Sequence, residues 1–433
     1  MKKMSVFIRL IELVICIIAG TLLILAVYIL PTASMKENVA RSSSVFDYEG
    51  IYPQLANGYK YTQLDNYTDS IMLGAAIYGE GGSLLDEAMN NYHIDCDDLS
   101  PTLALTNYAN NADFDYYAVS YARYWHGYLV PLKIFLLFFE YTDFRVFNFI
   151  MQSILICIIV SLFYKNNIQK NLLAFGSALI VLNPLTAALS LQYSSIYYII
   201  LLSSIYLLYI YYKRQHLEFS HFCTLLFFTG VITSYLDLLT YPLSSFGILM
   251  TLYIILNNRI NSKKHYVNDF MKGLITWGCG YFGMWMGKWS VGSLLLQSNI
   301  FSDALNQAMF RTSSSVGVVE NTSRMDAIIK NFGVLMKWPF VGMGIMICLY
   351  FIKDLTFKKN RISNIFINEI STIVAFLLIS VLPIMWFLVF ANHSQEHYWF
   401  TYKILSISCF SLLSLLIFIK EKYVNDKQYT IGE

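Results

Sequence analysis

Three aspartates in the segment 31–145 have the chemistry of a general base. Asp69 lies in the sequence LDNYTDSIML, and Asp65 and Asp47 are its alternatives in the same segment. A carboxylate can remove the proton from a hydroxyl group while that hydroxyl attacks an activated donor. Asp69 can equally cap a helix over residues 70–78, which requires the same residue type at the same place. The two roles do not exclude each other.

A second group of side chains suits an anionic, sugar-bearing ligand. It lies in YARYWHGYLVP, residues 121–131. Arg123 can bind a phosphate through two N–H groups, and His126 can exchange a proton near neutral pH. Tyr124 and Trp125 can stack on a sugar ring. An aromatic belt at the level of the lipid headgroups, with Arg123 reaching toward water, predicts the same residues, so both interpretations stay open.

Two lysines are further candidates for binding a phosphate. Lys288 closes the run WGCGYFGMWMGKW, where a cation needs water, a partner or an anionic ligand. Lys403 ends the run NHSQEHYWFTYK, residues 392–403. The same run supplies three candidate substrate-binding residues: His393, His397 and Tyr402.

Three charged residues near these candidates have less defined roles. Asp237 lies in a short turn, where it can pair with Lys288 or Arg123, or cap the next helix. Arg311 and Arg324 follow in the segment 290–331. They suit an anionic headgroup but are also ordinary residues of a solvated loop, so the sequence assigns them no role.

Metal chemistry has weaker support. Asp95, Asp97 and Asp98 form a DxDD cluster that can bind a divalent ion, but the glycine and glutamate of a calcium loop are missing. His393 and His397 are four residues apart, yet the HEXXH order is absent and no third ligand is evident. We therefore name a divalent metal as a candidate cofactor and assign no metal ligand.

The whole chain has the composition of a polytopic membrane protein. Hydrophobic residues make up 56% and charged residues 13%, whereas a soluble chain is about a quarter charged. Ten apolar segments approach the ~20 residues that a helix needs to cross a bilayer. They are residues 13–30, 146–164, 172–189, 195–212, 222–236, 241–256, 273–288, 332–351, 373–390 and 404–419. We predict an all-α protein of about ten transmembrane helices that forms a single domain, 1–433.

The charges predict the orientation of the chain. With the N-terminus inside, short cytoplasmic segments hold 18 of the 30 basic residues. The other face carries the segment 31–145 between the first two spans, with 15 acidic and 6 basic residues. We expect both termini to be cytoplasmic and this loop to be extracytoplasmic, with short interfacial helices at 70–78, 84–92 and 128–139. The net charge of +2 gives no reason to expect a nucleic acid partner.

YTDSIML, RYWHGY and NHSQEHYWFTYK resemble motifs of a bacterial group related to the phage-type O-antigen glucosyltransferases. The anchor helix, long outer loop and further spans are similar to the GT-C fold of membrane glycosyltransferases. The resemblance implies transfer of a sugar from an undecaprenyl-phosphate carrier to a cell-surface glycan on the outer face of the cell membrane. It makes a first-loop aspartate the base, by position Asp69. Thr68 stands where many relatives have a second acidic residue, which leaves Asp65 and Asp47 open.

The implied reaction is a single inverting displacement. Asp69 would remove the acceptor proton while Arg123, Lys288 or Lys403 stabilises the departing lipid phosphate. The alternatives are a flippase or transporter of lipid-linked sugars, a polysaccharide polymerase, and a non-catalytic membrane scaffold. A transporter is expected to place ionisable residues near the middle of its spans. Here they gather near the ends of the spans, which favours surface chemistry.

Overall fold

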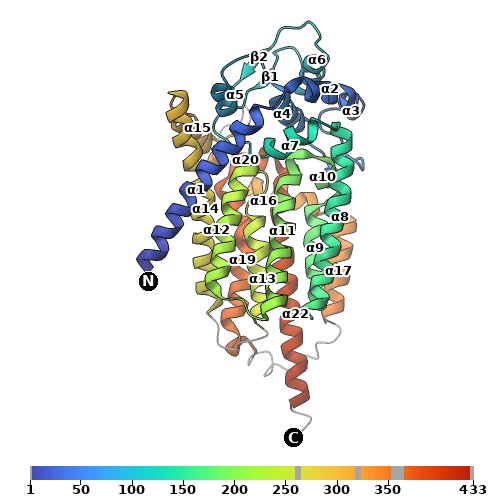
Figure 1. Cartoon of the computed structure of the whole chain (residues 1–433). Coiled ribbons are helices and arrows are strands. Elements are labelled where there is room, and N and C mark those ends of the chain that lie inside the picture. The colour runs from blue at the N-terminus through green and yellow to red at the C-terminus, as the bar shows by residue number, and fades with distance from the viewer. Residues whose placement is uncertain (1, 259–264, 317–322, 353–364, 430–433) are drawn as a thin grey trace.

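The computed structural model describes residues 2–258, 265–316, 323–352 and 365–429. The described chain is almost entirely helical, and short elements cover one end of a bundle of longer helices (Figure 1). We call the covered end the loop end and the opposite end the far end. Some basic residues of the expected cytoplasmic segments lie outside the described residues: Arg259, Lys263, Lys264, Lys353, Lys358, Lys359 and Arg361.

Helices of the bundle account for the membrane character of the chain. They are α1 (Lys2–Tyr28), α8 (Tyr141–Lys165), α9 (Leu172–Leu182), α11 (Leu191–Arg214), α12 (Phe219–Leu236), α13 (Ser244–Asn257), α14 (Tyr266–Leu296), α17 (Trp338–Ile352), α19 (Ile370–Val389) and α22 (Ser406–Tyr429). Six segments among the described residues are long and apolar enough to cross a membrane: Phe7–Tyr28, Tyr141–Lys165, Leu191–Arg214, Phe219–Leu236, Ile370–Val389 and Tyr398–Tyr423. The chain is therefore a multi-pass membrane protein. The other four predicted spans fall on α14 or on shorter helices.

Two of those four predicted spans are interrupted. Within residues 172–189, Asn183 has a φ of 55° and precedes Pro184, so α9 ends and α10 (Pro184–Leu189) begins. Proline lacks a backbone N–H and disfavours a helical conformation in the residue before it. Within residues 332–351, α16 (Arg324–Leu335) ends before α17 starts. Hydrophobic residues continue across both breaks, which is why the sequence predicted single helices there.

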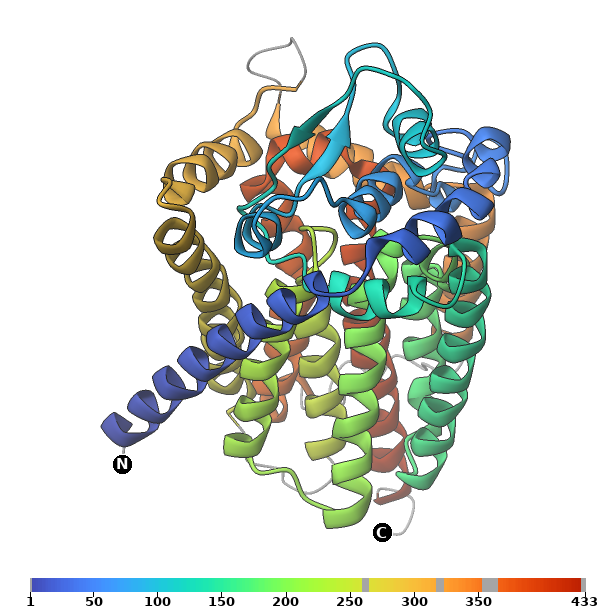
Figure 2. The ribbon, with the colours of Figure 1, turned by 45° about the horizontal axis from the view of Figure 1, so that its top comes forward.

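The segment 31–145 folds into a compact layer at the loop end (Figures 1 and 2). Its elements are α2 (Thr32–Ser42), α3 (Ser44–Glu49), η1 (Lys60–Thr62), α4 (Asn66–Ile77), α5 (Leu84–Asn90), β1 (His93–Asp95), α6 (Pro101–Ala109), β2 (Tyr117–Val119) and α7 (Leu129–Leu136). The predicted short helices at 70–78, 84–92 and 128–139 correspond to α4, α5 and α7. The antiparallel pair β1 and β2, with His93 opposite Val119, was not predicted.

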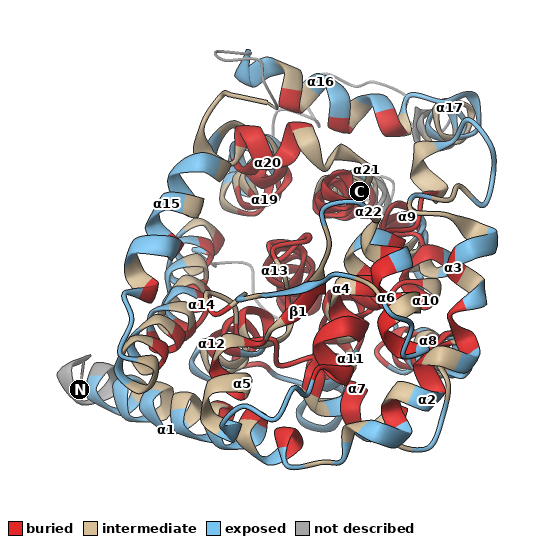
Figure 3. Ribbon diagram, turned by 90° about the horizontal axis from the view of Figure 1, so that it is seen from above, coloured by how far each residue is buried: buried red, intermediate tan, exposed pale blue. Residues whose placement is uncertain are grey.

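Five short elements complete the described fold. They are η2 (Gln169–Asn171), α15 (Ile300–Thr312), α20 (Ala391–Glu396), α21 (Tyr398–Thr401) and η3 (Tyr402–Leu405). Seen from the loop end, α15, α16 and α20 border the layer formed by the segment 31–145 (Figure 3). These elements bring late parts of the sequence beside the long loop.

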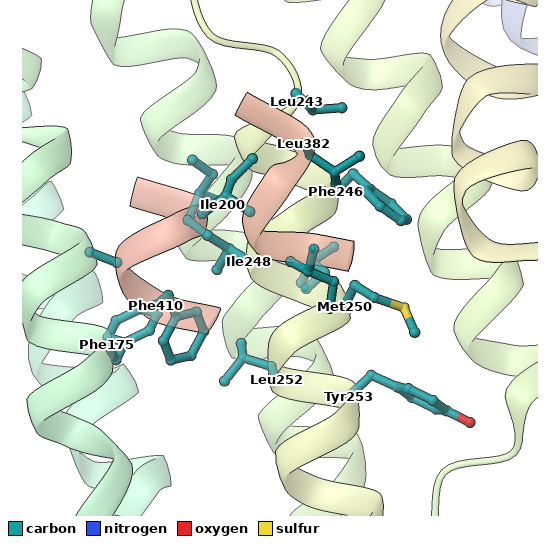
Figure 4. Packing of buried hydrophobic residues seen from close by; sticks show 14 of the residues in the cluster. Phe175, Ile200, Leu243, Phe246, Ile248, Met250, Leu252, Tyr253, Leu382 and Phe410 are labelled. Carbon is teal, nitrogen blue, oxygen red and sulfur yellow. The ribbon is translucent and has the colours of Figure 1, made fainter. Parts of the chain in front are cut away.

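The helix α13 forms the centre of the bundle (Figure 3). All its residues are buried, as expected for a helix that is apolar on every face. Figure 4 shows Ile248 and Met250 pointing from opposite sides of α13 toward neighbouring helices. Beside them Phe175 and Phe410 pack edge to face, with ring centroids 5.5 Å apart. This core fixes the relative positions of α9, α13 and α22.

Two glycines let α12 and α14 touch backbone to backbone. A Cβ added at Gly230 would lie 2.2 Å from the carbonyl oxygen of Trp277, and one added at Gly280 would lie 2.2 Å from that of Phe227. Small residues allow such close approach of membrane helices, where dispersion contacts replace the hydrophobic effect as the main attraction. The pair α12 and α14 is therefore held at a distance that a larger residue cannot keep.

Replacing Gly280 by leucine should destabilise the protein strongly, because the new side chain must push α12 away from α14. Overpacking a core costs about 1–3 kcal/mol, and backbone separation adds to that. We expect a clear fall in the thermal unfolding temperature of the detergent-purified protein. Gly278→Leu is the control, since a Cβ at Gly278 meets only Phe282 at 3.9 Å. Equal unfolding temperatures for both variants would contradict the proposed packing.

Candidate functional site

Asp69 is a buried structural acceptor. Its side chain has no exposed surface. Its Oδ1 accepts hydrogen bonds from Ser190 Oγ (2.9 Å) and Gln192 N (3.0 Å), and its Oδ2 accepts from Tyr141 Oη (2.7 Å) and Leu191 N (2.9 Å). The carboxylate thus satisfies backbone N–H groups at the start of α11 and ties α4 to α8. The prediction that Asp69 caps the helix over residues 70–78 is wrong, because Asp69 lies inside α4; its carboxylate instead accepts the N–H groups of Leu191 and Gln192 at the start of α11.

Asp65 takes the place expected for Asp69 at the start of α4. Its Oδ1 accepts the N–H of Thr68 at 3.0 Å, and its side chain is buried. Burial raises the pKa of Asp65 to about 7, although Thr68 and the neighbouring Trp399 favour the ionised form. Asp65 can therefore gain and lose a proton near neutral pH. Asp47, the third candidate base, lies exposed on α3.

Two arginines from distant parts of the chain lie at the loop end. Arg123 donates from Nη1 to Asp303 Oδ2 of α15 at 3.2 Å. Arg311, eight residues after Asp303, has its Nη1 3.3 Å from Glu396 Oε2 and 3.1 Å from His397 Nε2. The helix α15 thus holds one residue of each ion pair.

Aromatic rings connect these arginines with Asp65. The Arg123 guanidinium lies 5.6 Å from the ring centroid of Tyr124. Burial raises the pKa of Tyr124, and the positive charges of Arg123 and Arg311 both oppose this rise. On the other side, His397 packs against Trp399 with centroids 5.4 Å apart, and Trp399 adjoins Asp65. We call these residues the loop-end cluster: Asp65, Arg123, Tyr124, Arg311, His397 and Trp399.

Several buried nitrogen atoms of this region have no hydrogen-bond partner among the described residues. They are Arg123 Nε, His397 Nδ1 and the Nδ1 of the adjacent His393, whose Nε2 lies 2.8 Å from Leu239 O. Buried polar atoms are usually paired, and exceptions indicate water or a ligand. Burial and the charge of Arg311 lower the pKa of His397 to about 3, so this ring is neutral at physiological pH. Neutral imidazole nitrogens and guanidinium groups together suit an anion or a hydroxylated ligand.

His126 and Trp125 have structural contacts. The two ring nitrogens of His126 lie 3.0 Å from Tyr128 Oη and 3.0 Å from Tyr121 O. Burial lowers the pKa of His126 to about 3, so the proton exchange near neutral pH that the sequence predicted does not occur at this residue. The indole of Trp125 donates to Met284 O at 2.7 Å and fixes the loop against α14.

The two lysines predicted to bind phosphate instead bind helix ends. Lys288 and Lys403 are buried, as is Lys133. Their Nζ atoms donate to the carbonyls of Met89 (2.9 Å), Leu182 (2.6 Å) and Ala76 (2.7 Å), respectively. These carbonyls lie in the last turns of α5, α9 and α4, where backbone acceptors lack helical partners and the helix dipole favours a cation. Each of the two lysines therefore has a backbone partner that accounts for its burial without a phosphate.

Asp237 and Tyr402 also have local partners. Asp237 Oδ2 accepts from Thr240 N at 3.0 Å, and burial raises its pKa to about 7. The ion pair predicted with Lys288 or Arg123 is not present among the described residues, so Asp237 stabilises its own turn. Tyr402 Oη donates to Tyr61 O at 3.2 Å, which joins η3 to the segment 31–145.

No group of three or more His, Cys, Asp or Glu side chains is placed to hold a metal ion within the part of the chain that the structure describes. In the DxDD cluster, Asp95 Oδ1 accepts the N–H of Cys96 at 2.9 Å, and Asp97 Oδ1 accepts from Tyr117 Oη at 2.9 Å. These hydrogen bonds stabilise the turn after β1 and the pairing of β1 with β2.

The sequence prediction left Arg311 and Trp399 unassigned. Arg311 could have been recognised from its spacing from Asp303. Eight residues place two side chains about 80° apart around an α-helix, so both lie on nearly the same face. The partner Glu396 is 85 residues away in sequence, and no local pattern reveals that contact. Trp399 belongs to the run already singled out as NHSQEHYWFTYK, in which only His, Tyr and Lys residues were named as candidate site residues.

Comparisons of the chain with protein families, with curated proteins and with solved structures found no match. The functional assignment therefore depends on the chemistry of the loop-end cluster.

Proposed function

We propose that this protein is a membrane glycosyltransferase. It moves a sugar from a polyprenyl-phosphate carrier to a cell-surface glycan, and its loop end faces outward. The observation that carries the proposal is the loop-end cluster, in which a carboxyl group with a pKa near 7 and two arginines are connected through aromatic rings. A base and a pair of fixed cations are the two functions that a displacement at a phosphate-linked sugar requires.

In the proposed reaction Asp65 is the general base. It takes the proton of the acceptor hydroxyl as the hydroxyl oxygen attacks the anomeric carbon of the sugar. The bond between that carbon and the phosphate oxygen breaks, the configuration inverts, and polyprenyl phosphate leaves. Arg123 and Arg311 stabilise the negative charge that grows on the departing phosphate. Tyr124 and Trp399 are placed to contact the sugar.

The proposal includes the topology of ten spans with both termini in the cytoplasm. The helix α22 ends beyond the far end of the bundle, and α1 leans away from the loop end toward the N-terminus (Figures 1 and 2). This arrangement agrees with cytoplasmic termini and an outward-facing loop end.

A reconstitution assay distinguishes the proposal from transport. Proteoliposomes containing the purified protein would receive polyprenyl-phosphate sugars extracted from the producing cells, together with their surface glycan. We expect a new glycosidic bond, detected by linkage analysis, that is also missing from cells without the protein. Movement of the lipid-linked sugar across the vesicle membrane with no new bond would instead identify a transporter.

The two arginines should determine the affinity for the donor. Arg123→Lys and Arg311→Lys keep the charge but lose the planar pair of N–H groups that matches a phosphate. We expect each to raise the donor KM about 10-fold to 100-fold, the size of a lost charge-assisted hydrogen bond. Arg324→Lys is the matched control, because Arg324 donates to the carbonyls of Leu388 and Thr312. A donor KM that is the same in all three variants would remove the arginines from the site.

A further inference from the structure

Two tyrosines of the segment 31–145 stack on each other at the surface of the loop end. Tyr52 lies in the loop after α3, and Tyr67 is the second residue of α4. Their rings are nearly parallel, with an interplanar angle of 13° and centroids 6.1 Å apart. Both side chains remain partly exposed, at 42% and 39%. The transfer reaction proposed above assigns neither of them a role.

These tyrosines form the outer part of a row of aromatic rings that reaches the loop-end cluster. The centroid of the Tyr52 ring lies 5.3 Å from that of Trp399, and Trp399 adjoins Asp65. Burial raises the pKa of Tyr52, and the charge of Asp65 raises it further, as expected for a hydroxyl close to that carboxylate. We call Tyr67, Tyr52 and Trp399 the aromatic row. It leads from the protein surface to the proposed general base.

Backbone hydrogen bonds fix the position of Tyr52 in this row. The carbonyl of Pro53 accepts the N–H of Leu64 at 2.9 Å, and the N–H of Leu55 donates to the carbonyl of Thr62 at 3.2 Å. These bonds close the loop 53–64, so that Tyr52 stays beside the start of α4. Because the rings are held in place before a ligand arrives, a ligand loses little affinity to the ordering of these side chains.

The outer end of the row lies on the side of the layer that is turned away from the bundle. Burial raises the pKa of Tyr67, and the charge of Asp95 in β1 raises it further, so the Tyr67 hydroxyl lies near that strand. The strands β1 and β2 lie on the side of the layer away from the long helices (Figures 1 and 2), and β1 crosses the middle of the layer seen from the loop end (Figure 3). An aromatic belt at the lipid headgroups would instead surround the periphery of the bundle. The position of the row therefore favours a water-soluble ligand over a lipid.

A glycan chain matches the row in shape and in charge. Tyrosine and tryptophan rings combine a flat apolar face with a hydroxyl or N–H group, and a sugar ring likewise combines a flat C–H face with hydroxyl groups. Rings that follow one another at 6.1 and 5.3 Å offer contacts to successive sugar residues. The segment 31–145 carries 15 acidic and 6 basic residues, and this excess of negative charge disfavours a polyanion such as a nucleic acid.

We propose that the aromatic row binds the acceptor, and that the acceptor is an extended glycan chain rather than a free monosaccharide. The sugar that is modified places its hydroxyl at Asp65, beside Trp399, and the neighbouring sugars of the chain lie against Tyr52 and Tyr67. This assignment rests on the proposed function and adds to it the surface that selects the acceptor.

Binding of the glycan in the absence of donor tests the row directly. The probes are fluorescently labelled oligosaccharides cut from the surface glycan of cells that lack the protein, and fluorescence anisotropy measures their binding to the full, detergent-purified chain. We expect Tyr52→Leu and Tyr67→Leu each to weaken binding about 3-fold to 10-fold, the size of one lost aromatic contact. Tyr52→Phe and Tyr67→Phe keep the rings and should bind nearly as tightly as the wild type. Tyr48→Leu is the matched control, because Tyr48 is 93% exposed on α3 and lies outside the row.

Kinetics separate this assignment from the proposed reaction. In the transfer assay, Tyr52→Leu and Tyr67→Leu should raise the acceptor KM by the same factor and leave the donor KM unchanged. Equal affinity for the oligosaccharides in the wild type, both leucine variants and Tyr48→Leu would overturn the assignment, as would competition by the constituent monosaccharides that is as strong as competition by the oligosaccharides. Oligosaccharide binding that depends on both tyrosines, with no transfer of sugar, would support the binding surface and contradict the proposed reaction instead.

Discussion

Replacing Asp65 by asparagine is expected to reduce sugar transfer by about 10²-fold to 10⁴-fold, the usual contribution of a general base. The protein should remain folded, because the asparagine oxygen can still accept the N–H of Thr68 and cap α4. The measurement is kcat/KM with the purified variant in proteoliposomes, at matched amounts of inserted protein. Asp47→Asn, at an exposed position, is the control and should keep full activity.

The pH profile of sugar transfer by the wild-type protein provides a second test of the role proposed for the same residue. A base acts in its deprotonated form, and burial raises the pKa of Asp65 to about 7. The value of kcat/KM should therefore rise with pH up to about 7 and level off above it. Full activity of Asp65→Asn, or a wild-type profile that stays flat between pH 5 and 8, would place the base elsewhere.

Asp69→Asn should affect a different property: it should reduce the stability of the protein rather than act directly on sugar transfer. Four donors converge on the Asp69 carboxylate. An asparagine offers one oxygen to them and turns its own N–H groups toward the remaining donors. Leaving buried donors unpaired at this position should cost roughly 3–5 kcal/mol. We expect a large decrease in thermal unfolding temperature and in the yield of inserted protein.

The two aspartates form a matched pair, because the same substitution is made four residues apart in one segment. Asp65→Asn should be stable and inactive, whereas Asp69→Asn should be unstable. The reverse result, a well-folded Asp69→Asn protein that no longer transfers sugar, would make Asp69 the base, as the family resemblance implies.

The sequence predicted the class of fold because hydrophobicity and length determine which helices can cross a bilayer. It also placed the short helices α4, α5 and α7. It did not predict the break at Asn183 and Pro184, since the surrounding residues stay apolar on both sides. The strands β1 and β2 are three residues long, and their pairing connects residues 93–95 with 117–119, which no local pattern specifies.

The candidate site was predicted less well than the fold, for a physical reason. A buried lysine signals that a partner exists, but not which one. For Lys288 and Lys403 the partners are backbone carbonyls of α5 and α9, nearly 200 residues or more away in sequence. Arg123 and Asp65 were among the candidates because their residue types suit a phosphate and a proton. Their connection through Trp399 and Arg311 depends on the folding of four separate segments.

The attachment of α15 has a consequence for how a ligand reaches the arginines. A joint at residues 297–299, where Gln297 has a φ of 51°, links α15 to α14. Beyond this joint, Asp303 and Arg311 fasten the helix to Arg123 and Glu396. In the proposed reaction, the donor phosphate would compete with these carboxylates for the same two guanidinium groups. We expect its binding to weaken both ion pairs, so that α15 can rotate about residues 297–299 and open access to the two arginines.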